Sequence, residues 1–272
     1  MKRLIKKYPV LAFAAIVLLP VHGILWPLRL SGVGLENLQG LKLLFALIPS
    51  IGALIITNFI EGEHQARKLW QRVYPQRSDI KIYLVALVSI TGIGSLAVLV
   101  RFVLDGLLPS WGSLPSVQEA IFLLPFLLFF PGFTEEFGWR GFMQQKLQKR
   151  NGVFLASLMT GLVWGGWHCM DFLLGNWPAG TFNVLLFFAY ITGTSIVIGG
   201  LYAWSKGSVA VAILAHFSAN MVNFFLPVWN NEAGTKTPII FISLLWAVAF
   251  VILAVEVRRS KKIQRPNPEL IE

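Results

Sequence analysis

The chain has 272 residues, of which 56% are hydrophobic and only 13% are charged, and its mean hydropathy is +0.67. A soluble domain would carry about 25% charged residues, so the composition excludes an ordinary water-soluble fold. The formal net charge of +10 could suggest a nucleic-acid partner, but its distribution argues otherwise, because the 23 lysines and arginines lie in short stretches between apolar runs. The single cysteine, Cys169, excludes an internal disulfide and any metal cluster built from cysteines.

Eight apolar segments follow one another along the chain. Each has about 20 residues and could cross about 30 Å of hydrocarbon as a helix, with the fourth at the lower limit. They cover residues 8–26, 41–60, 81–104, 118–135, 152–171, 181–203, 207–227 and 238–257. The sequence therefore predicts an all-α polytopic membrane protein with about eight transmembrane helices and membrane lipid as its surroundings. Residues 1–257 would form one integral-membrane domain, and residues 258–272 a polar cytoplasmic tail.

The positive charges predict the orientation of these helices. If both termini are cytoplasmic, 18 of the 23 lysines and arginines fall on the cytoplasmic side. Four fall on the outer side, namely Arg29, Lys42, Arg101 and Lys236, and Arg140 is the remaining one. This bias predicts a multi-pass protein of the cell membrane with both termini in the cytoplasm.

Two adjacent carboxylates and an arginine interrupt an apolar stretch at PGFTEEFGWRGFM, residues 131–143. Ionisable groups inside a membrane are costly and usually mark a functional interior. Glu136 and Arg140 are four residues apart on a helix and can pair. That pair would leave Glu135 free for other work.

His168 is the second predicted site residue, and its position relates it to Glu135. The two residues are nearly equidistant from a predicted turn at Asn151-Gly152. If the flanking segments form a helical hairpin, each residue lies about 16 residues, or about 24 Å, from the turn. The two side chains should therefore meet at one depth. Trp164, one helical turn before His168, and Cys169 are interpreted as packing residues.

A polar stripe on the seventh segment supplies the remaining predicted residues. His216 and Asn220 are four residues apart, and Asn223 continues the same stripe among apolar neighbours. The alternative interpretation is hydrogen bonding between helices, which is favoured for Asn223 and less so for Asn220. Asp171 and Glu119 lie near predicted helix ends and are expected to be exposed to water.

One carboxylate, two imidazoles and an amide at one depth suit the activation of a water molecule. Glu135 would act as general base, one imidazole would help hold the water, and the other imidazole with the amide would stabilise an oxyanion. Glu135, His168 and His216 could instead bind zinc with a position left open for water. The sequence lacks H-E-x-x-H, G-x-S-x-G and a Walker loop, which argues against a helical zinc protease of that kind, a serine esterase and a P-loop NTPase.

Three motifs in order resemble the CPBP family of intramembrane proteases, which includes CAAX prenyl endopeptidases of the second type and bacterial Abi proteins. The first is Glu135-Glu136-Phe-Gly-Trp-Arg140, followed by Gly-Phe. The second is Trp164-Gly-Gly-Trp-His168, with tryptophan where the family usually has phenylalanine. The third is His216-Phe-Ser-Ala-Asn220. Together they span about a third of the chain.

The resemblance implies an eight-helix endopeptidase with a cavity among helices 4, 5 and 7, a protease core at about residues 118–227, and an opening to the cytoplasmic side and the membrane. Glu135 and His168 would activate water, and His216 and Asn220 would stabilise the oxyanion or complete a metal site. Glu136 and Arg140 would order the site. A metalloprotease and a metal-free glutamate protease both stay open, as does zinc.

The expected substrate is a membrane-bound peptide or protein. Two other functions compete with the peptidase. The first is a scaffold of the same family whose catalysis is dispensable, such as a bacteriocin-immunity protein or an envelope regulator. The second is a transporter, which is less favoured because the two halves of the sequence show no correspondence and the polar groups gather in three late segments.

Overall fold

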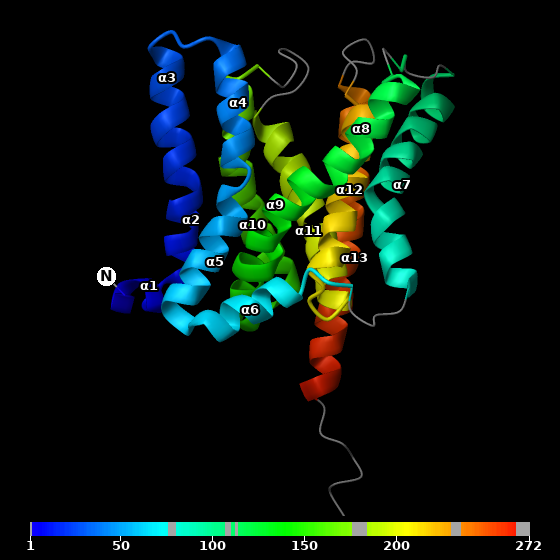
Figure 1. Ribbon diagram of the computed structural model, residues 1–272. Helices are drawn as coiled ribbons and strands as arrows, with labels where there is room; N and C mark the ends of the chain where they lie inside the picture. Colours follow the sequence, from blue (N-terminus) through cyan, green and yellow to red (C-terminus); the bar gives the residue numbers. More distant parts are fainter. Residues whose placement is uncertain are drawn as a thin grey trace, which may run out of the picture.

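The structure is a computed structural model and describes residues 2–75, 80–106, 110–111, 114–175, 184–229 and 235–264. Within these ranges every regular element is a helix, and the helices stand side by side in one bundle (Figure 1). The predicted all-α membrane architecture is confirmed. In the C-terminal half, α10 packs on α11, α11 on α13, and both α12 and α13 on α7.

The first half of the chain forms two long helical paths joined by short turns, and a third long helix, α7. Its elements are α1 (Lys2–Lys7), α2 (Pro9–Pro20), η1 (Val21–Leu25), α3 (Trp26–Leu30), α4 (Leu35–Phe45), α5 (Ile48–Glu61), α6 (Glu63–Gln71) and α7 (Ile80–Asp105). Here η marks a π-helical turn. We call the end of the bundle that carries α1 and α6 the basal end, and the opposite end, where α4 begins, the upper end (Figure 1).

The second half carries all the predicted site residues. Its elements are α8 (Val117–Leu127), η2 (Leu128–Phe133), α9 (Thr134–Gly138), η3 (Trp139–Gln144), α10 (Gln145–Leu173), α11 (Val184–Trp204), α12 (Val209–Phe225) and α13 (Lys236–Gln264). The fourth predicted segment, 118–135, is therefore too short, because the helical path continues beyond Glu135 into α10. Residues 181–183 of the sixth segment and 265–272 of the predicted tail lie outside the described residues.

Six helical stretches of the described chain are long and apolar enough to span a membrane. One of them, Val117–Phe172, has 56 residues and contains a sharp turn, and the apolar helix Val209–Phe225 is shorter than the others. The multi-pass character is thus confirmed, while the number of eight transmembrane helices stays a prediction.

The sharp turn falls where Asn151-Gly152 predicts it. Gly152 has φ +74°, a left-handed conformation that glycine adopts without strain. The helix that restarts after it is capped from α13, because the Glu256 carboxylate accepts hydrogen bonds from the backbone N–H groups of Val153 at 2.5 Å and Phe154 at 2.8 Å. The path from α8 to α10 is therefore a helical hairpin with its turn at the basal end.

The acidic motif lies on a short helix with a wide turn on each side. α9 has five residues between the π-helical turns η2 and η3, and Pro131 in η2 removes one backbone donor from the helical ladder. Such π-helical turns often occur at functional sites. α9 also packs closely on α5, because Gly138 faces the backbone of Pro49 and a Cβ at Gly138 would lie 2.6 Å from the Pro49 carbonyl carbon.

Candidate active site

Seven of the predicted site residues come from four elements of the second half and gather inside the bundle. α9 supplies the two glutamates, η3 the arginine, α10 the tryptophan and one histidine, and α12 the second histidine and the amide. These are Glu135, Glu136, Arg140, Trp164, His168, His216 and Asn220. The predicted cavity among helices 4, 5 and 7 corresponds to this meeting of α9, α10 and α12.

Glu135 is buried and faces α10. Its Oε2 accepts a hydrogen bond from Trp164 Nε1 at 2.7 Å and a longer one from Trp139 Nε1 at 3.4 Å. His168 Nε2 lies 3.9 Å from the same oxygen. The two residues that the hairpin geometry places at one depth therefore do meet, at a separation too long for a direct hydrogen bond.

The other ring nitrogen of His168, Nδ1, contacts a carboxylate that was predicted to be exposed to water. His168 Nδ1 lies 2.7 Å from Asp171 Oδ2, and Asp171 also forms an ion pair with Lys42 of α4. Asp171 is only 3% exposed, so its predicted exposure to water is wrong. Asp171 is therefore buried although it lies near the end of α10.

The Nδ1 atom of His216 also contacts a carboxylate. It lies 2.8 Å from Glu136 Oε1, and Arg140 Nη1 donates to the same oxygen at 2.7 Å. Arg140 also donates to Ser195 of α11, to the hydroxyl at 3.1 Å and to the carbonyl at 3.4 Å. The predicted pairing of Glu136 with Arg140 is present, and both side chains are fully buried.

These contacts indicate which ring nitrogen of each histidine carries the proton. A carboxylate paired with a cation accepts hydrogen bonds, so His168 donates from Nδ1 to Asp171 and His216 donates from Nδ1 to Glu136. In the neutral imidazole the opposite nitrogen, Nε2, is then an acceptor. His168 thus presents an acceptor toward Glu135.

Trp164 occupies the middle of the site. Its ring centroid lies 5.6 Å from that of His168 and 5.2 Å from that of His216, and the Arg140 guanidinium lies 5.0 Å from the ring centroid. The indole N–H also bonds to Glu135. A phenylalanine at this position could pack in the same way but could not donate a hydrogen bond, so the interpretation of Trp164 as a packing residue alone is incomplete.

The two asparagines of α12 have different surroundings. Asn220 Nδ2 is buried, and it has no hydrogen-bond partner among the described residues. Asn223 Oδ1 instead accepts from Trp229 Nε1 at 2.8 Å and from Tyr190 at 3.3 Å. Its described hydrogen bonds thus join α12 to α11 and to Trp229, which is the hydrogen-bonding alternative considered for it.

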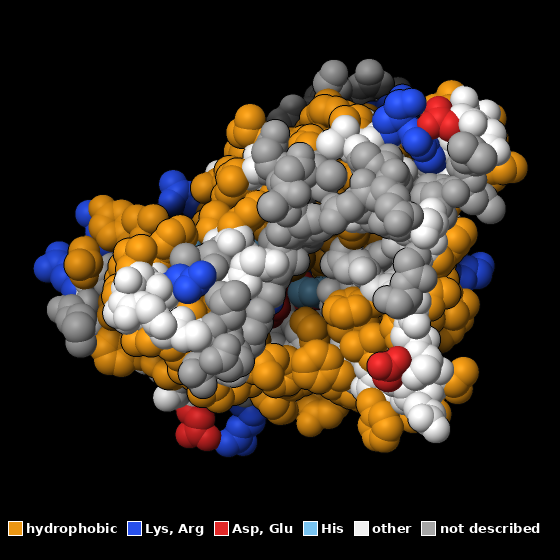
Figure 2. All heavy atoms as spheres, turned by 90° about the horizontal axis from the view of Figure 1, so that it is seen from above, with side chains coloured by type: hydrophobic (Ala, Val, Ile, Leu, Met, Phe, Trp, Pro, Cys, Tyr) orange, Lys and Arg blue, Asp and Glu red, His pale blue; other side chains and the backbone are white. Residues whose placement is uncertain are grey.

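The upper face of the bundle carries a hollow. Viewed from above, the molecule is hollowed near its centre, and a histidine and an acidic side chain are visible inside (Figure 2). The His168 side chain is 19% exposed, whereas those of Glu135 and His216 are each 5% exposed. Arg140 and Gln144 lie fully buried toward the basal end. The hollow and the described ends of the chain therefore lie at opposite ends of the bundle, because α1 and the C-terminal end of α13 are at the basal end (Figure 1).

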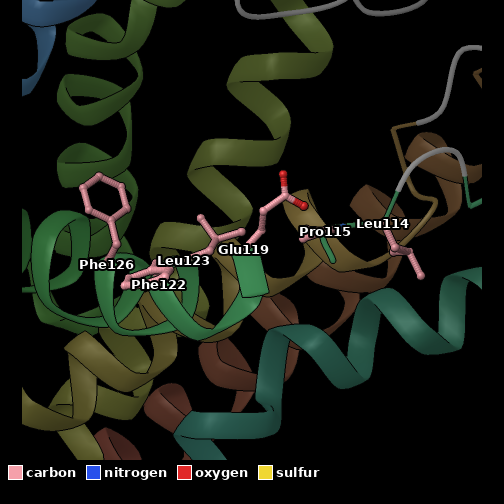
Figure 3. A pocket seen from close by; sticks show the side chains of 6 residues that line it. All are labelled: Leu114, Pro115, Glu119, Phe122, Leu123 and Phe126. Carbon is pink, nitrogen blue, oxygen red and sulfur yellow. The ribbon is translucent and has the colours of Figure 1, made fainter. Parts of the chain in front are cut away.

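A separate apolar cavity of about 720 Å³ lies along α8 and is not part of this cluster. It is lined by Leu114, Pro115, Glu119, Phe122, Leu123 and Phe126 (Figure 3). The one acidic side chain in that lining caps α8, since Glu119 Oε2 accepts from the Ser116 backbone N–H at 2.7 Å. This cavity therefore offers packing surface rather than reactive groups.

The zinc set considered above stays a prediction. In the part of the chain that the structure describes, no group of three or more histidine, cysteine, aspartate or glutamate side chains converges at metal-binding spacing. His168 and His216 each use Nδ1 on a different carboxylate, a contact that leaves Nε2 of each ring to face the site and that also occurs in metal-binding histidines. The chemistry of the site is therefore derived below from the side chains alone.

Comparison with known proteins supports the resemblance carried by the three motifs. The sequence model of the Rce1-like family, described as type II CAAX prenyl endopeptidases, matches residues 117–222. CAAX prenyl protease 2 of Methanococcus maripaludis is 30% identical over 123 residues, which are 43% of this chain and 45% of that protein. Lysostaphin resistance protein A of Staphylococcus haemolyticus is 28% identical over 130 residues, which are 46% of this chain and 34% of that protein.

The matches thus cover less than half the length of either relative. The family match nevertheless includes α8 through most of α12, and with them both glutamates, Arg140 and both histidines of the site. Lys42 lies outside it. The resemblance to the CPBP family is confirmed.

Proposed function

We propose that this CPBP-family membrane protein is an intramembrane endopeptidase that hydrolyses a peptide bond of a membrane-associated protein or peptide. Glu135 is the general base that activates water, and His168 positions that water. The family supports a CAAX-type protease in general terms. The observation that carries the mechanism is the gap of 3.9 Å between Glu135 Oε2 and His168 Nε2.

A single water molecule fits this gap. Placed about 2.8 Å from each atom, it donates one proton to Glu135 and the other to His168 Nε2, which leaves an oxygen lone pair for the substrate. His168 can accept only because Asp171 holds the proton on Nδ1. Asp171 and Lys42 are thus positioning residues, whereas Glu135 and His168 contact the reacting water.

Hydrolysis then proceeds in two steps. The water oxygen bonds to the scissile carbonyl carbon as its proton passes to Glu135, and the carbonyl oxygen becomes an oxyanion. Next the C–N bond breaks, and the Glu135 carboxyl returns the proton to the leaving amine. The products are a carboxylic acid and an amine, and Glu135 is regenerated.

The oxyanion needs donors, and α12 supplies them. Asn220 Nδ2 is a buried donor with no partner among the described residues, so it is free to bond to a developing negative charge. His216 can add a donor from Nε2 only when its ring is protonated, because Nδ1–H already points to Glu136. The ion pair of Glu136 with Arg140 holds that ring in place.

The direct test is cleavage of a membrane-anchored peptide library by the purified full-length chain in lipid nanodiscs. Glu135→Gln keeps the size of the side chain but removes the base, and cleavage should fall by at least about 100-fold. Glu63→Gln is the matched control, because Glu63 is exposed at the basal end. Equal activity of Glu135→Gln and the wild type would overturn the proposal.

The same assay addresses metal dependence. Since the mechanism above needs no metal, cleavage should survive exhaustive treatment with a chelator. Loss of cleavage that returns on addition of zinc would replace the metal-free mechanism and leave the peptidase activity standing.

The competing scaffold function can be separated from the peptidase in cells. If Glu135→Gln restores the phenotype of a deletion strain as well as the wild type at equal expression, catalysis is dispensable for that role. A transporter would instead show solute flux in proteoliposomes that does not depend on Glu135.

A further inference from the structure

The two ends of the bundle differ strongly in charge. Basal positions include thirteen lysines and arginines whose side chains are described: Lys2, Arg3, Lys6, Lys7, Arg67, Lys68, Arg72, Lys81, Lys146, Lys149, Arg150, Lys206 and Arg258. The upper end has four, namely Arg29, Lys42, Arg101 and Lys236. Three of these four pair with acids, since Lys42 contacts Asp171 while Arg101 and Lys236 contact Asp105.

Contacts across the bundle confirm that the basal segments share one end. Lys146 at the start of α10 pairs with Glu61 at the end of α5. The Val209 N–H at the start of α12 donates to the Arg72 carbonyl, at 3.0 Å. Because the basic segments are neighbours in space as well as short in sequence, the positive-inside rule applies to the basal end as a unit and places it in the cytoplasm.

The reactive groups lie nearer the other end. His168 is five residues before the end of α10 at Leu173, or about 8 Å along the helix axis, but sixteen residues, or about 24 Å, from the basal turn at Gly152. On the basal side of the site the side chains are fixed by hydrogen bonds. Arg140 donates to Glu136 and Ser195, and Gln144 donates to the Gly199 carbonyl at 3.1 Å. The hollow with a histidine inside is seen from the upper side (Figure 2).

We propose that the active site opens away from the cytoplasm, so that the substrate is a peptide segment presented at the outer leaflet or exported across the membrane. The inference rests on the proposed peptidase function for the nature of the substrate, but the orientation stands on charge and geometry alone. It replaces the cytoplasmic opening that the family resemblance implies. A cytoplasmic C-terminal tail peptide could not reach Glu135 in this orientation.

Thiol labelling of the full chain in intact bacterial cells tests the orientation without any need for activity. Cys169→Ser removes the one natural thiol. In that background, Ser31→Cys places a thiol between α3 and α4 at the upper end, and Gln65→Cys places one on α6 at the basal end, both at exposed positions. A membrane-impermeant maleimide should label Ser31→Cys fully in intact cells and Gln65→Cys only after permeabilisation. The reverse pattern, or equal labelling of both, would overturn the inference.

Substrate access is tested with a single-span reporter that carries a randomised peptide segment on either its outer or its inner side. Wild-type protein should cleave only the outer reporter, and Glu135→Gln neither. Glu135-dependent cleavage of the inner reporter would overturn the outward opening while the peptidase function stands. If wild-type protein cleaves neither reporter, the peptidase proposal fails, and the labelling result still decides the orientation.

Discussion

Asp171→Asn is the most informative substitution. It alters the hydrogen bonding of His168, which we propose holds the reacting water, and Asp171 itself does not contact that water. In the structure Asp171 Oδ2 lies 2.7 Å from His168 Nδ1, and Lys42 holds the carboxylate from the other side. Asparagine has the same shape, but its NH₂ group can face Nδ1. The ring then carries its proton on Nε2, which can no longer accept a hydrogen bond from the water beside Glu135.

The size of the effect follows from what is lost. A positioned acid–base group contributes about 10²–10⁴-fold to a rate, and Glu135 itself stays in place, so we expect kcat to fall about 100-fold, or about 2.7 kcal/mol. KM should change by less than about 2-fold, because neither Asp171 nor Lys42 contacts the reacting water. Lys42→Met should lower kcat by a smaller factor, about 5- to 10-fold, since Lys42 is 28% exposed and solvent compensates part of its charge.

The assay is steady-state cleavage of the best library peptide over a range of pH, together with thermal unfolding in the same lipid. A positioning role predicts a changed pH profile for Asp171→Asn and partial rescue by Asp171→Glu. If Asp171→Asn keeps kcat within about 3-fold of wild type at every pH while remaining folded, the role of His168 as water acceptor is refuted. A loss of kcat that merely follows a loss of folded protein would instead assign Asp171 a structural role.

Three further substitutions test other contacts. Trp164→Phe keeps an aromatic ring, although a smaller one, and loses the donor to Glu135, so kcat should fall about 10-fold with a modest loss in melting temperature; an unchanged kcat contradicts a role for the indole N–H. Asn220→Ala should lower kcat about 100-fold with little change in KM, and a rise in KM alone would assign Asn220 to substrate binding. Gly138→Ala should lower the melting temperature because its Cβ meets Pro49, whereas Gly92→Ala on α7 has open space and should not; equal melting temperatures would show that α5 and α9 can separate.

Much of the site could be predicted because helix geometry relates sequence distance to spatial distance. The positions of Glu135 and His168 on either side of Gly152 predict their meeting, since both arms of the hairpin rise by the same amount per residue. The pairing of Glu136 with Arg140 follows from a spacing of four residues on one helix.

What the sequence analysis missed depends on contacts between distant segments. Lys42 lies 129 residues from Asp171, and no pattern in the sequence relates the two. Asp171 itself could have been identified, because it follows His168 by three residues and so lies on the same face of α10. Its nearness to the helix end suggests exposure to water, but the side chain is only 3% exposed and pairs with Lys42 of α4.

Simple helical periodicity also could not predict the local backbone shape of the acidic motif. Pro131 signals a break in the helix, but it does not show that the break takes the form of a π-helical turn or that a second one follows at residues 139–144. Likewise, tryptophan in place of phenylalanine at position 164 looks like a conservative change in size. Only the structure shows that its N–H reaches Glu135.

The loose packing of α8 has a practical consequence for work on this protein. Among the described elements α8 contacts chiefly η2, the turn that directly follows it in the chain, and it leaves Val117, Ile121 and Phe122 more than half exposed. In a bilayer, hydrocarbon chains must supply the rest of its packing, and the chain runs directly from α8 through η2 to Glu135. We therefore expect bilayer thickness to affect the approach to Glu135. Kinetic constants of different variants are comparable only when acyl-chain length is held fixed.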